Sequence, residues 1–87
     1  MRFSNEDLIR RFNNGYTDGK SYSGNLYIEG DRLINYWTTI AKRDEEGNVV
    51  LNSDKYSRTT SKIQGYIRRI CNVVQEVSEK ELERRIS

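Results

Sequence analysis

Apolar and polar positions at the start of the chain predict one short helix. The apolar positions there fall on one helical face, and they are Leu8, Ile9 and Phe12. Ser4 precedes this stripe, and its hydroxyl can accept the backbone N–H of Asp7 as an N-cap. Gly15 supplies the left-handed residue at which such helices commonly end. We therefore predict a helix over residues 5–13.

Apolar and polar residues alternate in the middle of the chain, which is the pattern of strands with one buried face. The predicted strands are Leu26–Ile28, Leu33–Ala41 and Val49–Leu51. Polar turns at residues 29–32 and 44–48, each with a glycine, join them into a three-stranded antiparallel meander. Residues 16–24, YTDGKSYSG, show no period and are predicted to form a loop.

The spacing of apolar residues changes again near the C-terminus. Intervals of four, three, four and three residues line one face of a long helix, and they separate Ile63, Ile67, Ile70, Val74 and Val77. Ser61 and Gln64 have the capping-box spacing expected at its start. Ser78 and Glu81 repeat that spacing before Leu82, which predicts a short last helix. The stripe is expected to cover the sheet, and the alternative is a dimer seam.

These elements predict an α+β fold. We expect an N-terminal helix, a three-stranded antiparallel meander, a long C-terminal helix packed on the sheet and a short last helix. The chain has 87 residues, which is enough for one hydrophobic core and too few for two, so residues 1–87 are expected to form a single domain. Because 34% of the residues are apolar and 32% are charged, that core should be thin.

The composition argues against catalysis. The sequence has no histidine and a single cysteine, Cys71, which removes the commonest general base and the usual zinc ligands. Cys71 lies in an apolar run and is expected to be a core thiol. The chain also lacks the glycine-rich phosphate-binding loop of nucleotide hydrolases. We expect a protein that is not an enzyme and needs no cofactor or metal.

No apolar run is long enough to span a bilayer, so we expect no membrane association and a cytoplasmic location.

The net charge of +2 hides an uneven distribution. Residues 55–72 carry five basic residues and no acid, whereas residues 44–54 carry four acids and no base. Hydroxyl and aromatic side chains accompany the basic ones, and such groups contact phosphates and stack on bases. The predicted macromolecule-binding residues are Lys55, Tyr56, Arg58, Thr59, Lys62, Tyr66, Arg69 and Tyr36. We assign the phosphate contacts to Arg58, Lys62 and Arg69.

A purely structural interpretation of the same segment stays open. Residues 57–61 would cap the helix, Tyr56 and Tyr66 would pack, and the basic side chains would neutralise the acids of residues 44–54. Tyr36 and Trp37 are adjacent in a predicted strand, so one ring should be buried and the other exposed as a binding anchor.

Two motifs give a resemblance. LINYWTTIAKR, followed by GNVVLNSDKYSRTTSKIQ, resembles a family of small uncharacterised domains from phages and other mobile elements, over residues 33–64. The resemblance implies an origin and brings no catalytic residue or cofactor with it. Small phage proteins without catalytic residues often inhibit host defence nucleases, CRISPR effectors among them.

Two functions follow as expectations. The first is an anti-CRISPR-like inhibitor or modulator of a host nucleic-acid-directed complex, binding a protein or nucleoprotein partner in the host cytoplasm through the basic segment. The alternative is a DNA- or RNA-binding accessory protein whose affinity falls with salt. Either protein is expected to be a monomer or a homodimer.

Overall fold

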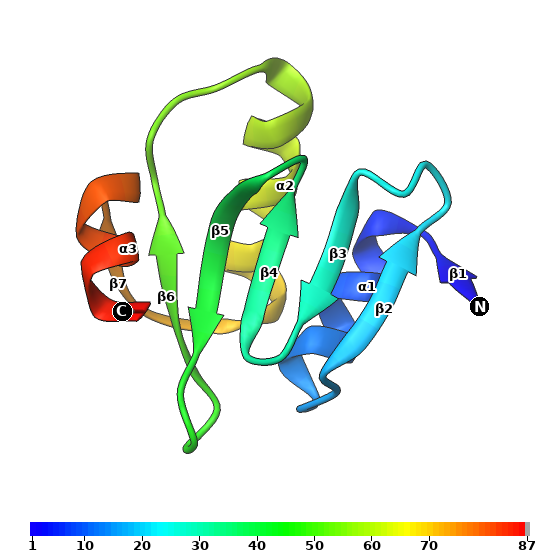
Figure 1. Cartoon of the computed structure of the whole chain (residues 1–87), viewed down its shortest axis with the longest axis horizontal. Coiled ribbons are helices and arrows are strands. Elements are labelled where there is room, and N and C mark those ends of the chain that lie inside the picture. Colours follow the sequence, from blue (N-terminus) through cyan, green and yellow to red (C-terminus); the bar gives the residue numbers. More distant parts are fainter. Residues whose placement is uncertain (87) are drawn as a thin grey trace.

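The structure is a computed structural model that describes residues 1–86, and it contains one mixed sheet and three helices (Figure 1). The elements in chain order are β1 (Arg2–Phe3), α1 (Asn5–Asn13), β2 (Asp18–Ser21), β3 (Leu26–Glu29), β4 (Arg32–Asn35), β5 (Thr38–Arg43), β6 (Asn48–Asn52), α2 (Arg58–Ile70), β7 (Asn72–Val77) and α3 (Glu79–Ile86). Strand order in the seven-stranded sheet is the same as chain order, from β1 to β7.

The sheet is antiparallel in its middle and parallel at both edges. Strands β2 to β6 form a continuous antiparallel meander. At the edges, β1 runs parallel to β2, and β7 runs parallel to β6. A parallel neighbour needs a crossover connection, and α1 and α2 supply the two crossovers.

The helices lie on both faces of the sheet. Helices α1 and α2 pack against each other behind the sheet as it is seen in Figure 1, and α3 lies in front, against β5 and β6. The main core lies between the sheet and the first two helices, and its buried residues are Leu8, Ile9, Phe12, Leu26, Ile28, Leu33, Ile40, Ala41, Val49, Leu51, Ile63, Ile67 and Cys71. On the other face, α3 is anchored by Leu82, which is fully buried.

The α+β class and both terminal helices are confirmed. Helix α1 has the predicted bounds, and the hydroxyl of Ser4 accepts the N–H of Asp7 at 3.1 Å. Helix α3 follows Ser78, whose hydroxyl accepts the N–H of Glu81 at 3.2 Å. Local capping chemistry was therefore a sufficient signal for these two helices.

The three-stranded meander is wrong, because the sheet has seven strands. Residues 16–24, predicted as a loop, contain β2, which pairs with β3 through Asp18↔Glu29 and Lys20↔Tyr27. Strand β2 consists of Asp, Gly, Lys and Ser, so it has no apolar alternation to reveal it. The strand is held in place by its backbone hydrogen bonds to β3 and by the packing of α1 against it.

The predicted long strand Leu33–Ala41 is also wrong. It consists of β4 and β5, which are joined by a tight turn at Tyr36 and Trp37. That turn contains no glycine or proline, and Tyr36 adopts a φ of 59°, a left-handed conformation that tyrosine rarely takes. Tyr36 is 51% exposed and Trp37 is 92% exposed, so the expectation that one ring is buried is wrong.

The long C-terminal helix is shorter than predicted. Helix α2 packs on the sheet as expected, but it ends at Ile70, and residues 72–77 form edge strand β7. Its N-cap is Ser57, whose hydroxyl accepts the N–H of Thr60 at 3.3 Å, and not Ser61. The helical spacing continued by coincidence, since Val73 packs on the core while Val74 is exposed. β-Branched valines suit a strand as well as a helix, so spacing alone could not decide.

Arg43, the last residue of the motif IAKR, serves the fold. Its guanidinium is buried and donates to the backbone oxygens of Phe12, Tyr16 and Gly15 at the end of α1. A cation is favourable there, because carbonyl groups at a helix C-terminus carry partial negative charge. Arg43 thus ties α1 to the middle of the sheet.

Candidate functional site

One end of the sheet brings together three chain segments, which lie at the top of Figure 1. The turn between β4 and β5 is hydrogen-bonded to Asn25, which precedes β3, through the N–H of Tyr36 at 2.6 Å. The end of β4 is joined to the first turn of α2 by the side chain of Asn35, which donates to the hydroxyl of Thr60 at 2.9 Å. We name this region the aromatic end and define it by Tyr36, Trp37, Tyr56 and the first turn of α2.

The aromatic rings here are unusually exposed. Trp37 is almost fully exposed, and Tyr36 and Tyr56 are about half exposed or slightly less. Large exposed aromatic residues in a group are typical of binding surfaces, where they supply most of the contact energy. Tyr36 is in addition held in a left-handed conformation that costs an L-residue with a side chain ~1 kcal/mol or more.

A small pocket lies between the two tyrosines. It has a volume of about 190 Å³, and its lining consists of Asn35, Tyr36, Thr38, Ile40, Tyr56, Ser57 and Thr60. The side chains of Asn35 and Thr60 are buried, and the Thr60 hydroxyl also lies 3.3 Å from that of Ser57. The pocket therefore combines two aromatic rings with hydroxyl groups at a helix N-terminus.

Tyr56 is held in place by hydrogen bonds of its hydroxyl group to Asn52 and Glu79. Its hydroxyl accepts from the side-chain amide of Asn52 at 3.0 Å and donates to Glu79 at 2.8 Å. Asn52 is fully buried, and it also donates to the backbone oxygen of Thr39 and accepts the N–H of Asp54. Burial raises the pKa of Tyr56, and its hydrogen bond to Glu79 raises it further. The ring is therefore fixed before any ligand arrives.

The basic side chains at this end carry no internal partner. Within the described part of the chain, Lys55, Arg58 and Lys62 are exposed and form no ion pair. Arg58 is the first residue of α2, and the first turn of that helix contains no acid. A helix N-terminus carries partial positive charge, so the cation and the helix dipole add to one electropositive site.

The structure separates the eight predicted site residues into two groups. Six of them lie at or next to the aromatic end: Lys55, Tyr56, Arg58, Thr59, Lys62 and Tyr36. Tyr66 and Arg69 lie farther along α2, where Tyr66 packs against the core. Arg69 lies 5.1 Å from the Tyr66 ring centre and pairs with Glu6 of α1 at 3.4 Å.

Part of the structural interpretation is wrong. Within residues 1–86, the basic side chains of α2 form no ion pair with residues 44–54. The Asp44 carboxylate accepts the N–H groups of Glu46 and Asn48 at 2.9 Å, and its pKa is lowered, chiefly by the bond from Asn48. Arg68 instead pairs with Glu76 of β7 at 2.9 Å.

The sequence did not predict the pocket, and only Tyr36 and Tyr56 of its seven lining residues are among the predicted site residues, while Asn35 is one of those missed. The signal for Asn35 was a polar residue in an otherwise apolar strand, LINYW. Trp37 was considered only as one of two alternative anchors, and both rings are in fact exposed. The turn that exposes them has no glycine or proline that would have marked it.

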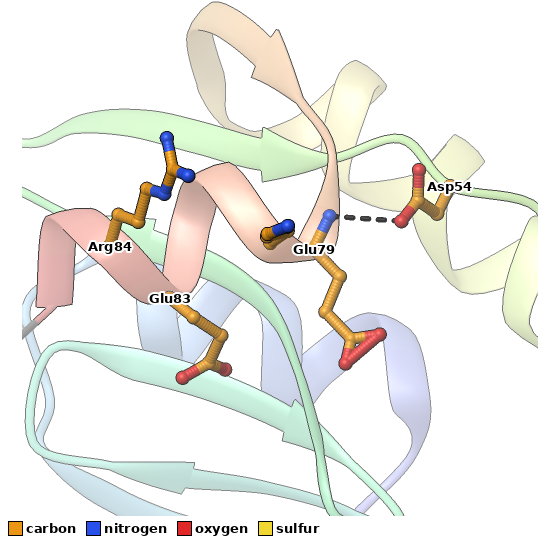
Figure 2. Close-up of a pocket in the computed structure, with 5 residues that line it drawn as sticks. Asp54, Glu79, Glu83 and Arg84 are labelled. Carbon is orange, nitrogen blue, oxygen red and sulfur yellow. Dashed lines mark hydrogen bonds between the residues drawn. The ribbon is translucent and has the colours of Figure 1, made fainter.

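A larger groove lies at another place, between α3 and the segment after β6 (Figure 2). It has a volume of about 560 Å³ and is lined only by charged residues, Asp54, Glu79, Lys80, Glu83 and Arg84. The Asp54 carboxylate accepts the N–H of Glu79 at 2.9 Å, so it serves as part of the start of α3. In Figure 2 the Glu79 and Arg84 side chains extend in different directions, so they do not converge on one point.

The remaining candidates for chemistry are metal-ligating clusters and the thiol of Cys71. Among residues 1–86 no group of acids and cysteine has the geometry to hold a metal ion. Burial raises the pKa of the Cys71 thiol to about 11, which keeps it protonated at neutral pH. Within the same range no helix has the length and apolar character needed to cross a membrane.

Comparison with known proteins adds no further constraint. No protein-family model, curated protein or solved structure matches the chain. The resemblance over residues 33–64 to a phage and mobile-element family therefore stays a prediction.

Proposed function

We propose that the chain is a non-enzymatic binding protein that inhibits or modulates a nucleic-acid-directed defence complex of a host, in the manner of an anti-CRISPR protein. The observation that carries the proposal is the aromatic end, where exposed rings lie beside cations without internal partners. The partner is a nucleoprotein complex, and the aromatic end competes there with nucleic acid.

The energetics of such a surface support this proposal. Trp, Tyr and Arg are the residues that most often dominate binding free energy at interfaces. Unpaired cations at a helix N-terminus attract phosphate, and they do so without any ion pair having to be broken first. Because the net charge of the chain is only +2, this local concentration matters more than the overall charge.

A second candidate is a single-stranded DNA- or RNA-binding accessory protein. The exposed ring of Tyr56 between Lys55 and Arg58 favours it, since aromatic rings flanked by cations are the usual means of holding single strands. In this case the free nucleic acid is the ligand, and no host complex is needed.

A phage-plating assay tests the first candidate. Bacteria that carry CRISPR–Cas or other nuclease-based defences would express the wild type or the triple variant Trp37→Ala, Lys55→Ala, Arg58→Ala. The wild type should raise phage plating on at least one of these hosts, and the variant should not. The matched control is Lys80→Ala with Arg84→Ala, which removes two cations from the groove in Figure 2 and should behave like the wild type.

Two results would count against the proposal. One is no effect of the wild type on any nuclease-based defence in the panel. The other is full activity of the aromatic-end variant. To separate the two candidates, binding of the wild type to a free oligonucleotide is compared with binding to a guide-loaded effector. Equal affinity for both would favour the accessory protein.

A further inference from the structure

We propose that the pocket between Tyr36 and Tyr56 accepts one unstacked base of a single-stranded nucleic acid. This inference rests on the proposed function, because it names the ligand chemistry of the same aromatic end. It makes the pocket the site for the base and the start of α2 the site for the adjoining phosphates.

The size of the pocket limits what can enter. Its volume of about 190 Å³ equals the space of roughly six water molecules at ~30 Å³ each. Pockets for drug-sized ligands are larger, at about 300–1,000 Å³. One planar ring system therefore fits, while a whole nucleotide would have to leave its sugar and phosphate outside.

The chemistry of the lining matches a base. Two tyrosines in the lining can stack on a base, and the Thr38 hydroxyl has no hydrogen-bond partner within residues 1–86, whereas those of Ser57 and Thr60 already bond to each other and to the start of α2 or Asn35. A hydroxyl can turn to donate or to accept, so it suits the edges of different bases without selecting one. The expected preference is for any unpaired base and not for a particular sequence.

The backbone of Tyr36 is a second, independent observation. A tyrosine with a φ of 59° is strained, and strain of this kind persists where a side chain must be held for a ligand. Glycine would take the same turn without strain, but it would remove one wall of the pocket. The turn is therefore built to present this ring.

The cations select a nucleic acid over a protein as the occupant. Lys55 and Arg58 flank Tyr56 and Ser57 in the sequence and have no ion pair within residues 1–86. An aromatic side chain of a protein partner would fill the pocket but would need separate acidic residues to pair with these cations. A nucleotide would use both, because its phosphate adjoins its base.

The test is fluorescence anisotropy with a labelled oligothymidine and with the same oligomer carrying abasic positions. The intact strand should bind the wild type about 5- to 150-fold more tightly, the range expected for stacking of one base. The variant Thr38→Leu fills the pocket and should abolish the difference. Its matched control, Thr17→Leu, places the same residue at an exposed position outside the pocket and should preserve the difference.

Each contrary result overturns the inference. Equal affinity for the intact and abasic strands means that phosphates alone are recognised. A difference that survives in Thr38→Leu means that the base stacks elsewhere. Tyr36→Gly provides a second variant if Thr38→Leu does not fold, and it should also abolish the difference. If neither strand binds while the plating activity still requires Trp37, the partner is a protein and only the base pocket is wrong.

Discussion

The two halves of helix α2 carry similar charge and use it in different ways. In the first half, Arg58 and Lys62 extend into solvent and pair with no acid in the described chain. In the second half, Arg68 pairs with Glu76 and Arg69 pairs with Glu6. Cations in the second half thus serve the fold, and those in the first half are available to a partner.

The two halves of α2 also differ in what their cations contribute to the free energy of folding. Surface ion pairs each contribute about 0–1 kcal/mol, so the pairs in the second half stabilise the fold only modestly. Arg58 stands at the N-terminus of the helix, where the dipole disfavours a cation by ~0.3–1 kcal/mol. The chain retains a residue there that does not help it fold, which is the behaviour expected of a binding residue.

The largest expected effect comes from removing the unpaired cations. The triple variant Lys55→Ala, Arg58→Ala, Lys62→Ala should bind single-stranded oligonucleotides at least ~10-fold more weakly. The slope of log K against log salt should fall by about 2, because each phosphate contact contributes ~0.7. Anisotropy titrations across a salt series measure both.

The control for this prediction is the paired half of the helix. Arg68→Ala with Arg69→Ala removes two cations and should leave the affinity and the salt slope close to those of the wild type. Equal losses in the two variants would show that the division of α2 has no bearing on binding.

Tyr36→Gly separates folding from binding at the aromatic end. Glycine relieves the left-handed strain, so the free energy of unfolding should stay the same or rise by ~1 kcal/mol. Binding should weaken, because the ring is lost. Urea denaturation gives the stability and anisotropy gives the affinity. A clear loss of stability would mean that the ring serves the fold.

The Arg68–Glu76 pair should have a smaller effect, and on stability only. Both side chains are about half exposed, at 45% and 42%, so solvent screens their attraction. A double-mutant cycle of Arg68→Ala and Glu76→Ala should give a coupling free energy under about 1 kcal/mol by urea denaturation. Altered binding in either single variant would contradict the assignment of this pair to the fold.

The smallest effect is the pH dependence of the same pair. The hydrogen bond from Arg68 lowers the pKa of Glu76 in the folded state. The bond therefore stabilises the fold fully above the ordinary glutamate range, about pH 4.3, and is lost as pH falls through the folded-state value. The stability difference between wild type and Glu76→Gln should be constant near neutral pH and shrink on acidification, as measured by thermal melts. A difference that grows below that range would contradict this.

The elements that the sequence predicted are those with a local signal. Helices α1 and α3 were predicted from Ser4 and Ser78, whose hydroxyls accept a backbone N–H in the first turn of each helix. Strand β7 had no such signal, because Val74 and Val77 continue a helical spacing and only the pairing with β6 makes this segment a strand. Strand β2 was missed for a similar reason, since a run of polar residues becomes a strand only through its neighbour.

The candidate site was also predicted only where it has a local signal in the sequence. A cluster of like charges is visible in a sequence, so Lys55, Arg58 and Lys62 were found. Whether a cation has a partner depends on elements far away along the chain, and Arg69 is paired with Glu6 of α1. The exposure of Trp37 depends on a turn that nothing in its sequence marks.

The order of the strands has a consequence for how fast this chain should fold. Every strand pairs only with the strands that precede and follow it in the chain, and the longest segment between paired strands is the one that contains α2. Each pairing step therefore closes a short loop, and the entropy of loop closure stays small. Topologies of this kind belong to the faster side of mixed α/β folding, so the chain should reach its native state without waiting for a distant strand to arrive.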